Sequence, residues 1–325
     1  MWRTTLSAAA VAALVTVAPS GAVMAQGDDY PDRPIHFVAP YGPGGTVDPT
    51  ARVIAAAVSD ILGQPTVVEN RAGAAGSVGT QHVINSDADG YTVLIHTNLV
   101  ATEPCLKPDL PYDFLESMKP VMALTETPFV ILVHPSIEAN DLDALIEYSK
   151  AHPGELNFGA SGVGSSGHMR GEQFMTQNEV ELTFIPYQDG GSTLAALVGN
   201  EIQVAFDTLP GSIGMVRDRR LKLLAVGTKE RFFLTPDTPT LEDQGYTNLA
   251  PQWIGAYLPK ETPDDVTNKL AEAMATALET PDVQKQLQNL GFTTVGTGPE
   301  DTLKTLEEET QMWCDTIEKA GISIQ

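Results

Sequence analysis

The chain has 325 residues, and its 42 acidic side chains outnumber the 19 lysines and arginines, for a net charge of −23 at neutral pH. A protein that binds DNA or RNA needs a basic face, so this composition excludes a nucleic-acid partner. A chain of this length with ordinary hydrophobic content also exceeds what one hydrophobic core usually serves, which favours two lobes.

The first 25 residues have the pattern of a cleaved signal peptide. Arg3 precedes an uncharged, apolar stretch from Leu6 to Pro19, which is too short for a membrane-spanning helix. Val23-Met24-Ala25 places small or modest residues where a signal peptidase cleaves, so we predict a mature chain that begins at Gln26 and resides in the periplasm. A retained membrane helix is the alternative, but no stop-transfer charge cluster follows the stretch. The residue directly after the cleavage site is Gln26 rather than a cysteine, so we expect no lipid anchor.

The chain has two cysteines, Cys105 and Cys314. In an oxidising compartment an isolated pair is more often a disulfide than two free thiols. We therefore expect a bridge, although the sequence alone leaves open whether the two residues lie close enough to form one.

Short apolar runs alternate with helical segments from Arg33 onward, which predicts an α/β protein built from strand–helix units. The predicted strands are 35–40, 65–70, 91–97, 129–135, 156–161, 182–187, 202–208, 221–228 and 253–259. The clearest early helix is 49–62, with Asp48 as its cap, Pro49 at its first position and Gly63 as its stop signal.

The C-terminal part is mainly helical, with predicted helices at 263–279, 281–290 and 299–320 and a turn at 296–300. The chain is predicted to leave its first lobe near Pro128 and to return near Trp253. The predicted lobes are 26–127 and 246–325 for lobe 1 and 128–245 for lobe 2. Two crossings between the lobes would form a hinge.

Three glycine-rich loops, 41–48, 71–79 and 160–168, each follow a strand and precede a helix. In open α/β sheets ligands bind where such loops gather, and a helix N-terminus attracts anions through its free N–H groups and its dipole. Arg71 is the only lysine or arginine in the three loops, so an anion would be held mainly by backbone amides and hydroxyls. Gly45 and Gly164 are the positions where a Cβ would most disturb the approach of backbone to ligand.

The sequence supports an enzyme less well than an anion-binding protein. Residues 162–167 satisfy G-x-G-x-x-G, and Glu181 lies near the spacing of a ribose-binding acid, so a nucleotide-dependent oxidoreductase is the remote alternative. The motif is mid-chain, however, and an exported protein has little access to nicotinamide cofactors. The six histidines lack metal-site spacing, and no G-x-S-x-G elbow occurs. We expect no catalytic residue, no metal and no cofactor.

Two single residues allow more than one interpretation. His168 can contact a ligand or simply pack at the start of its helix. Asp207, at the end of a strand, can receive a ligand hydroxyl or amine, or it can cap the helix after Pro210.

Several segments together resemble the Bug/TctC family, the periplasmic receptors of tripartite tricarboxylate transporters. The resemblance covers nearly the whole mature chain, in the right order. It is carried by residues 33–52, 61–80, 89–95, 110–113, 152–168, 184–191, 223–231, 239–246, 253–259 and 318–322.

This resemblance implies a type II periplasmic-binding-protein fold, in which two α/β lobes close on a carboxylate ligand. Loops 41–48 and 71–79 would hold one carboxylate, partly through ordered water, and loop 160–168 would hold the other end of the ligand. The predicted ligand-binding residues are Tyr41, Gly44, Gly45, Asp48, Ala74, Gly76, Thr97, Asn98, Ser161, Gly162, Gly164, Ser165, His168, Tyr187 and Asp207.

One segment departs from the family pattern. Many relatives have Pro-Tyr-Lys-Gly where this chain has Pro186-Tyr187-Gln188-Asp189-Gly190. The loss of a positive charge and the gain of an acid leave the distal group of the ligand open.

The predicted function is capture of a di- or tricarboxylate, or a related organic acid, and its delivery to the membrane permease subunits of a tripartite transporter. A sensor subunit that presents the ligand to a membrane kinase is the alternative, because the same lobes serve both roles. We expect a monomer with no nucleic-acid partner.

Overall fold

The computed structural model describes residues 30–43, 46–247 and 251–322. Residues 31–325 form one compact unit, separate from residues 1–30, and the description below concerns that unit. The predicted signal peptide, residues 1–25, lies outside the described residues.

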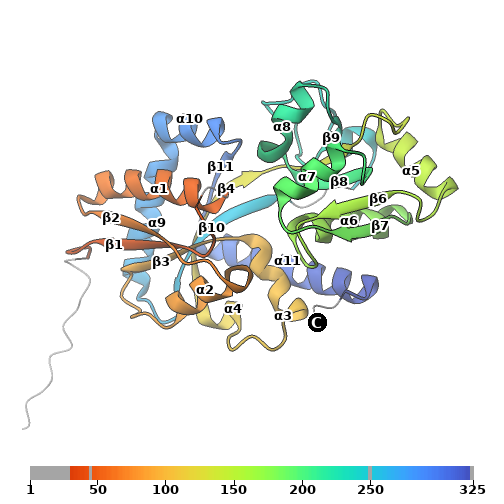
Figure 1. Ribbon diagram of the computed structural model, residues 1–325. Coiled ribbons are helices and arrows are strands. Elements are labelled where there is room, and N and C mark those ends of the chain that lie inside the picture. Colours follow the sequence, from red (N-terminus) through yellow and green to blue (C-terminus); the bar gives the residue numbers. More distant parts are fainter. Residues whose placement is uncertain (1–29, 44–45, 248–250, 323–325) are drawn as a thin grey trace, which may run out of the picture. The chain divides into compact units, whose positions relative to one another are not determined.

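The strands of this unit form two sheets (Figure 1). The first sheet has the order β11 (Thr293–Thr297), β4 (Met118–Thr127), β10 (Gln252–Pro259), β3 (Thr92–Thr97), β1 (Ile35–Ala39) and β2 (Thr66–Asn70). The second has the order β7 (Thr183–Pro186), β6 (Asn157–Ala160), β8 (Val204–Thr208), β5 (Phe129–Val133) and β9 (Lys222–Val226). Each sheet combines parallel neighbours, such as β1 with β2 and β3 or β6 with β7 and β8, with an antiparallel strand, β10 or β5.

Helices connect the strands. The α-helices are α1 (Val47–Leu62), α2 (Ser77–Ile84), α3 (Glu103–Leu106), α4 (Phe114–Ser117), α5 (Leu142–Ala151), α6 (Ser166–Asn178), α7 (Gly190–Val198), α8 (Leu209–Arg217), α9 (Asp264–Glu279), α10 (Pro281–Asn289) and α11 (Pro299–Ala320). Three short 3₁₀ helices are η1 (Ala74–Gly76), η2 (Asn98–Thr102) and η3 (Glu242–Gln244). Among the described residues, none of these helices combines the length and the apolar character that a bilayer crossing requires.

The core of the second sheet follows from the alternation of side chains along β5. Ile131 and Val133 are buried on one face, with residues of α5 and α6, whereas Val130 and Leu132 are buried on the other, with residues of α7 and α8. A strand buried on both faces reads as a continuous apolar run, which is why the sequence pattern predicts β5 well.

Two strands were not predicted, β4 and β11. Pro120 lies within β4, where proline removes a backbone donor and argues against a central strand, and the pairing with β10 is irregular beside it. In β11 the predicted turn at 296–300 overlaps the strand. Gly296 has a left-handed φ of 71°, and it lies where the pairing with β4 shifts register, as expected of a bulge.

The start of α1 also differs from the prediction. The helix begins two residues earlier, at Val47, and its N-cap is Thr46 rather than Asp48. Asp48 therefore lies inside the first turn, where its carboxylate forms an ion pair with Arg52 and accepts a hydrogen bond from Asn70 Nδ2, both at 2.9 Å. Gly63 does end the helix, in the left-handed conformation with φ 68°.

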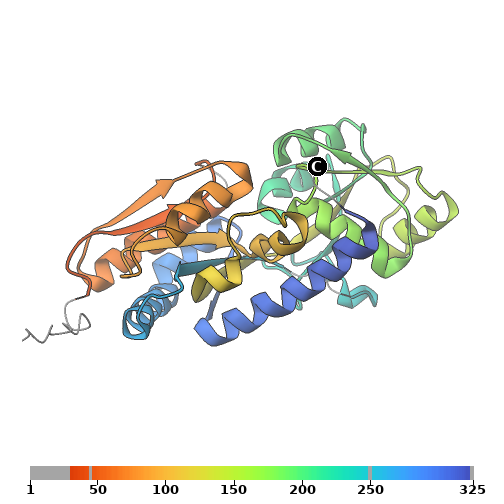
Figure 2. The same ribbon diagram turned by 90° about the horizontal axis from the view of Figure 1, so that it is seen from below.

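The chain passes between the sheets twice, from β4 to β5 and from the segment after β9 back to β10. Helix α11 also joins the two halves, because it packs on β4 and η2 of the first half and on α6 of the second. Figures 1 and 2 both show α11, in dark blue, running beneath α6.

Cys105 on α3 and Cys314 on α11 form a disulfide in the structure, with their Cα atoms 5.5 Å apart. The bridge joins residues 209 positions apart in the sequence.

Candidate functional site

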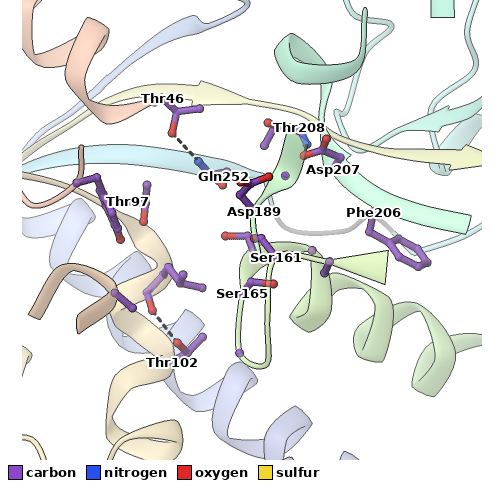
Figure 3. Close-up of a pocket in the computed structure, with 18 of the residues that line it drawn as sticks. Thr46, Thr97, Thr102, Ser161, Ser165, Asp189, Phe206, Asp207, Thr208 and Gln252 are labelled. Carbon is purple, nitrogen blue, oxygen red and sulfur yellow. Dashed lines mark hydrogen bonds between the residues drawn. The ribbon is translucent and has the colours of Figure 1, made fainter. Parts of the chain in front are cut away.

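A cavity of about 650 Å³ lies between the two sheets (Figure 3). Its lining comes from the carboxyl ends of strands β1, β3, β6 and β8 and from the first residues of helices α1, α6 and α7. The antiparallel strands β5 and β10 reach the same place with their first residues, Phe129 and Gln252. The carboxyl edge of an open α/β sheet is where such folds bind ligands.

The part of the first sheet's wall formed by β3 and the loop after β1 is polar and carries no charged side chain at neutral pH. His96 on β3 is fully buried, and burial lowers its pKa to about 4. Its Nδ1 donates to the Thr97 carbonyl oxygen at 3.0 Å, which leaves Nε2 as an acceptor with no hydrogen-bond partner in the described part of the chain. Burial also keeps the pKa of Tyr41 well above its usual value, so its phenol stays a neutral donor.

The second sheet contributes the loop between β6 and α6. Ser161 and Ser165 line the cavity from this loop, and Figure 3 shows both below Asp189. Ser165 is the N-cap of α6 and accepts a hydrogen bond from the His168 backbone N–H. The start of a 13-residue helix therefore faces the cavity with its positive dipole end.

The close packing of α6 against β8 requires a glycine at the second helical position. A Cβ added at Gly167 would lie 2.5 Å from the backbone carbonyl oxygen of Phe206. Glycine here lets the helix start approach both the strand and the cavity.

Two carboxylates of the second half also line the cavity. Asp207 accepts a hydrogen bond from the Thr208 backbone N–H at 2.8 Å, and burial raises the pKa of Asp207 to about 6. Asp189 is the N-cap of α7 in a capping box with Ser192, and the hydrogen bonds from Ser192 lower its pKa.

The remaining charges of the cavity belong to one helical turn. Lys107 lies 3.5 Å from Glu103, four residues earlier, and Tyr112 donates a hydrogen bond to the same carboxylate at 3.3 Å. Among the described residues that line the cavity, Lys107 is the only lysine or arginine.

Of the predicted ligand-binding residues, the cavity brings together Tyr41, Thr97, Ser161, Gly164, Ser165 and Asp207. Gly44 and Gly45 lie outside the described residues, so the structure says nothing about them. The other seven, Asp48, Ala74, Gly76, Asn98, Gly162, His168 and Tyr187, are not part of the lining.

Several of these seven have other contacts. Asp48 is engaged with Arg52 and Asn70, as described above, and Asn98 donates to Glu309 Oε2 at 2.8 Å and to the Pro251 carbonyl oxygen at 3.1 Å. His168 is buried, and its Nδ1 accepts from the Gly164 backbone N–H at 3.0 Å while its ring stacks on Phe184. His168 thus holds the loop in place through its hydrogen bond with Gly164.

In the second glycine-rich loop the cavity is lined by Ala75 rather than by its neighbours Ala74 and Gly76. Ala74 and Ala75 both have left-handed backbone conformations, with φ of 44° and 53°, which is unfavourable for alanine. A Cβ at Gly76 would lie 2.8 Å from His96 Nε2, so this glycine lets the loop pack on the buried ring.

The sequence did not point to the lining residues Phe129, Thr193, Phe206 or Gln252, and it marked Thr46 only as part of loop 41–48. Gln252 Nε2 donates to Thr46 Oγ1 at 3.4 Å, a contact that spans 206 residues and that no local pattern could indicate (Figure 3). Gln188 and Asp189 also line the cavity, and they had been noted only as a departure from the family pattern.

Comparison with known proteins identifies the family. Residues 50–322 match the TctC family, described as the tripartite tricarboxylate transporter family receptor. This chain belongs to that family. The sequence-based resemblance to Bug/TctC proteins is therefore confirmed, and the members of this family are periplasmic binding receptors rather than enzymes.

Individual TctC-family relatives cover almost the entire chain. The protein BugT of Bordetella pertussis is 33% identical over 301 residues, which is 92% of each chain. A solved Rhodopseudomonas palustris structure with adipate has a TM-score of 0.79 at 30% identity and covers 91% of this chain and 100% of its own. MatC from the same organism, with bound malate, has a TM-score of 0.75 at 28% identity and covers 89% of this chain and 100% of its own. The predicted periplasmic-binding-protein fold is confirmed by these likenesses.

Proposed function

We propose that this TctC-family receptor captures a small carboxylate in the cavity between its two sheets and delivers it to the membrane permease subunits of a tripartite transporter. The observation that carries the proposal is the composition of the cavity. Strand ends from both sheets, the hydroxyls of Thr97, Ser161 and Ser165, and the N-terminus of α6 converge on one space. The adipate and malate bound by the two R. palustris relatives support a carboxylate as the ligand class.

The proposed mode of binding uses neutral donors. A carboxylate is stabilised by hydroxyls and backbone N–H groups at a helix start without a cationic side chain. We propose contacts to Tyr41, Thr97, Ser161, Ser165 and the backbone at Gly164. The two sheets with their helices would act as the two lobes, with boundaries near 127/128 and 245/246, and closure of one lobe on the other would shield the ligand.

The experiment that tests this function is a thermal-shift screen of C4 to C8 mono-, di- and tricarboxylates, acidic amino acids and aromatic acids on the mature protein. A ligand at 100 times its Kd stabilises the folded state by about 2.7 kcal/mol, which such a screen detects. The diamide of each dicarboxylate serves as a matched control, because it keeps the length and removes the charge. Stabilisation by no carboxylate, or equal stabilisation by the diamides, would contradict the proposal.

The proposal includes export to the periplasm with cleavage after Ala25, which N-terminal sequencing of periplasmic material checks. Delivery to permease subunits is tested by uptake. Cells that carry both permease subunits should take up the ligand only when this chain is present. A ligand-dependent change in a kinase output without any uptake would instead support the sensor alternative.

A further inference from the structure

The charges that line the cavity are unusual for a receptor of organic anions. Three described lining residues are acidic, Glu103, Asp189 and Asp207, against one basic residue, Lys107. Lys107 forms an ion pair with Glu103 at 3.5 Å, so these two charges offset each other on the wall of the first sheet. His96 adds no charge at neutral pH, because burial lowers its pKa to about 4.

The two remaining acids, Asp189 and Asp207, both lie on the wall of the second sheet. Figure 3 shows them on the same side of the cavity, with Thr97 on the opposite side. Within the described part of the chain, no lysine, arginine or histidine forms an ion pair with either carboxylate. The backbone N–H of Thr208 donates to Asp207, and Ser192 donates to Asp189.

This distribution gives the cavity two chemically different ends. One end offers the hydroxyls of Tyr41, Thr97, Ser161 and Ser165 and the start of α6, which suits one carboxylate. The other end has the acceptor oxygens of Asp189 and Asp207, and a second ligand carboxylate placed beside them would be repelled. Asp207 in particular is half-buried, and burial raises the pKa of its carboxyl group, so its charge is only partly solvated by water.

We propose that the ligand is an ω-amino carboxylate or a similar zwitterion, with its carboxylate at the hydroxyl end of the cavity and its ammonium group near Asp207 and Asp189. This inference rests on the proposed function, because it assigns the second end of the same ligand. The ammonium would donate hydrogen bonds to both carboxylates, and Gln188 would accept or donate a further one. A lysine at position 188 would reverse the preference by giving a second carboxylate a cation to pair with.

The test is calorimetry with three matched probes at each of three chain lengths, four, five and six carbons. Each set contains the dicarboxylate, the ω-amino carboxylate and the plain monocarboxylate. For at least one length we expect the amino carboxylate to bind at least tenfold more tightly than the dicarboxylate. In Asp207→Asn the ratio of the amino carboxylate's affinity to the dicarboxylate's affinity should fall at least fivefold. In Gln188→Lys the dicarboxylate should gain at least fivefold.

Asp218→Asn is the matched control, because Asp218 is an exposed acid at the end of α8 that does not line the cavity. The control should keep the wild-type ratio, and circular dichroism confirms that each variant is folded. Tighter binding of the dicarboxylates by the wild type would overturn this inference and leave the proposed function standing. Binding of none of the nine probes, together with no response in the carboxylate screen, would overturn both.

Discussion

Two regions of the molecule lie between the sheets and use charge in opposite ways. At the chain crossings, Arg170 of α6 is buried, and its guanidinium lies 4.5 Å from the ring centre of Phe129 and 4.3 Å from that of Trp313. Its Nη2 donates to the Pro251 carbonyl oxygen at 3.4 Å, and Glu309 of α11 is near enough to influence its pKa. In the cavity, by contrast, the polar lining outside the Lys107–Glu103 ion pair consists of hydroxyls, amides and two carboxylates without a cationic partner among the described residues.

The charges at the crossings are thoroughly partnered. Glu309 accepts hydrogen bonds from Trp253 Nε1 at 2.9 Å and from Asn98 Nδ2 at 2.8 Å, while burial raises the pKa of this carboxyl group. Burial likewise lowers the pKa of Arg170 to about 9. The buried cation between the sheets therefore serves the fold, whereas the carboxylate contacts proposed in the cavity are neutral donors. Changes at the crossings should therefore alter stability, and changes in the cavity should alter binding.

The largest effect on stability is expected from removal of the disulfide. The bridge closes a loop of 209 residues, and native disulfides typically contribute about 2–5 kcal/mol to the free energy of unfolding. We expect Cys105→Ser/Cys314→Ser to lose about 4 kcal/mol in urea titrations while ligand affinity changes less than threefold. Thiol titration of the denatured, non-reduced wild type should find no free thiol. Two titratable thiols would show that the bridge is not formed.

Replacement of Arg170 is expected to have the next largest effect. Arg170→Met keeps the aliphatic part of the side chain but removes the cation from the two aromatic rings and from Glu309. Breaking a buried charge interaction by removing one partner costs about 3–5 kcal/mol, and we expect a loss of about 3 kcal/mol in urea titrations. Arg170→Met/Glu309→Gln should recover part of it, because no buried carboxylate is then left without a cation. A single variant within 1 kcal/mol of the wild type would contradict the role assigned to Arg170.

In the cavity, Gly164→Val should mainly reduce affinity. We expect binding at least tenfold weaker, about 1.4 kcal/mol, because the side chain would intrude where the backbone lines the cavity. Gly162→Val is the matched control. Both glycines have positive φ, 75° at Gly164 and 94° at Gly162, but only Gly164 lines the cavity. Both variants should lose similar stability from backbone strain. Equal affinities of the two variants in calorimetry would show that this loop does not contact the ligand.

The smallest effect is a change in pH dependence at Asp207. Burial raises the pKa of this carboxyl group from 3.8 to about 6, so between these values the folded state keeps a proton that the unfolded state has lost. The contribution of Asp207 therefore makes the free energy of unfolding fall as pH rises from about 4 to 6, and the loss is complete above that window.

Asp207→Asn removes the destabilisation that the buried, ionised carboxylate causes above this pH window. We expect the ligand-free variant to be more stable than the wild type by about 1 kcal/mol at pH 7.5, a figure kept below the full pKa shift because the side chain is partly open to the cavity. The gain should shrink at pH 4.5. A gain that is equal at the two pH values, or a loss at pH 7.5, would contradict this assignment.

Local patterns predicted most of the fold, for reasons visible in single elements. The apolar run of β5 and the left-handed glycine that ends α1 are local signals, and both were interpreted correctly. Strand β4 was not predicted, because Pro120 argues against a central strand. Strand β11 was not predicted, because the glycine at its bulge, Gly296, is typical of a turn.

The candidate site was predictable where a glycine-rich loop marks it or, as for Thr97 and Asp207, where a predicted strand ends. The loop after β6 follows from its glycines and its helix start. Phe129 and Gln252 line the cavity because antiparallel strands bring their first residues to the edge where the parallel strands end. Asn98 follows a strand as a ligand-binding residue would, yet its partner Glu309 is 211 residues away. Such pairings depend on the tertiary fold, which no local pattern reveals.

The most direct test of this account is a crystal structure of the protein with the tightest-binding compound from the carboxylate screen. The account predicts a ligand carboxylate in the cavity, within hydrogen-bond distance of hydroxyls such as those of Thr97 and Ser161 or of backbone N–H groups, and with no lysine or arginine within 4 Å. A carboxylate paired directly with Lys107 or Arg71, or a ligand bound outside the cavity, would contradict it.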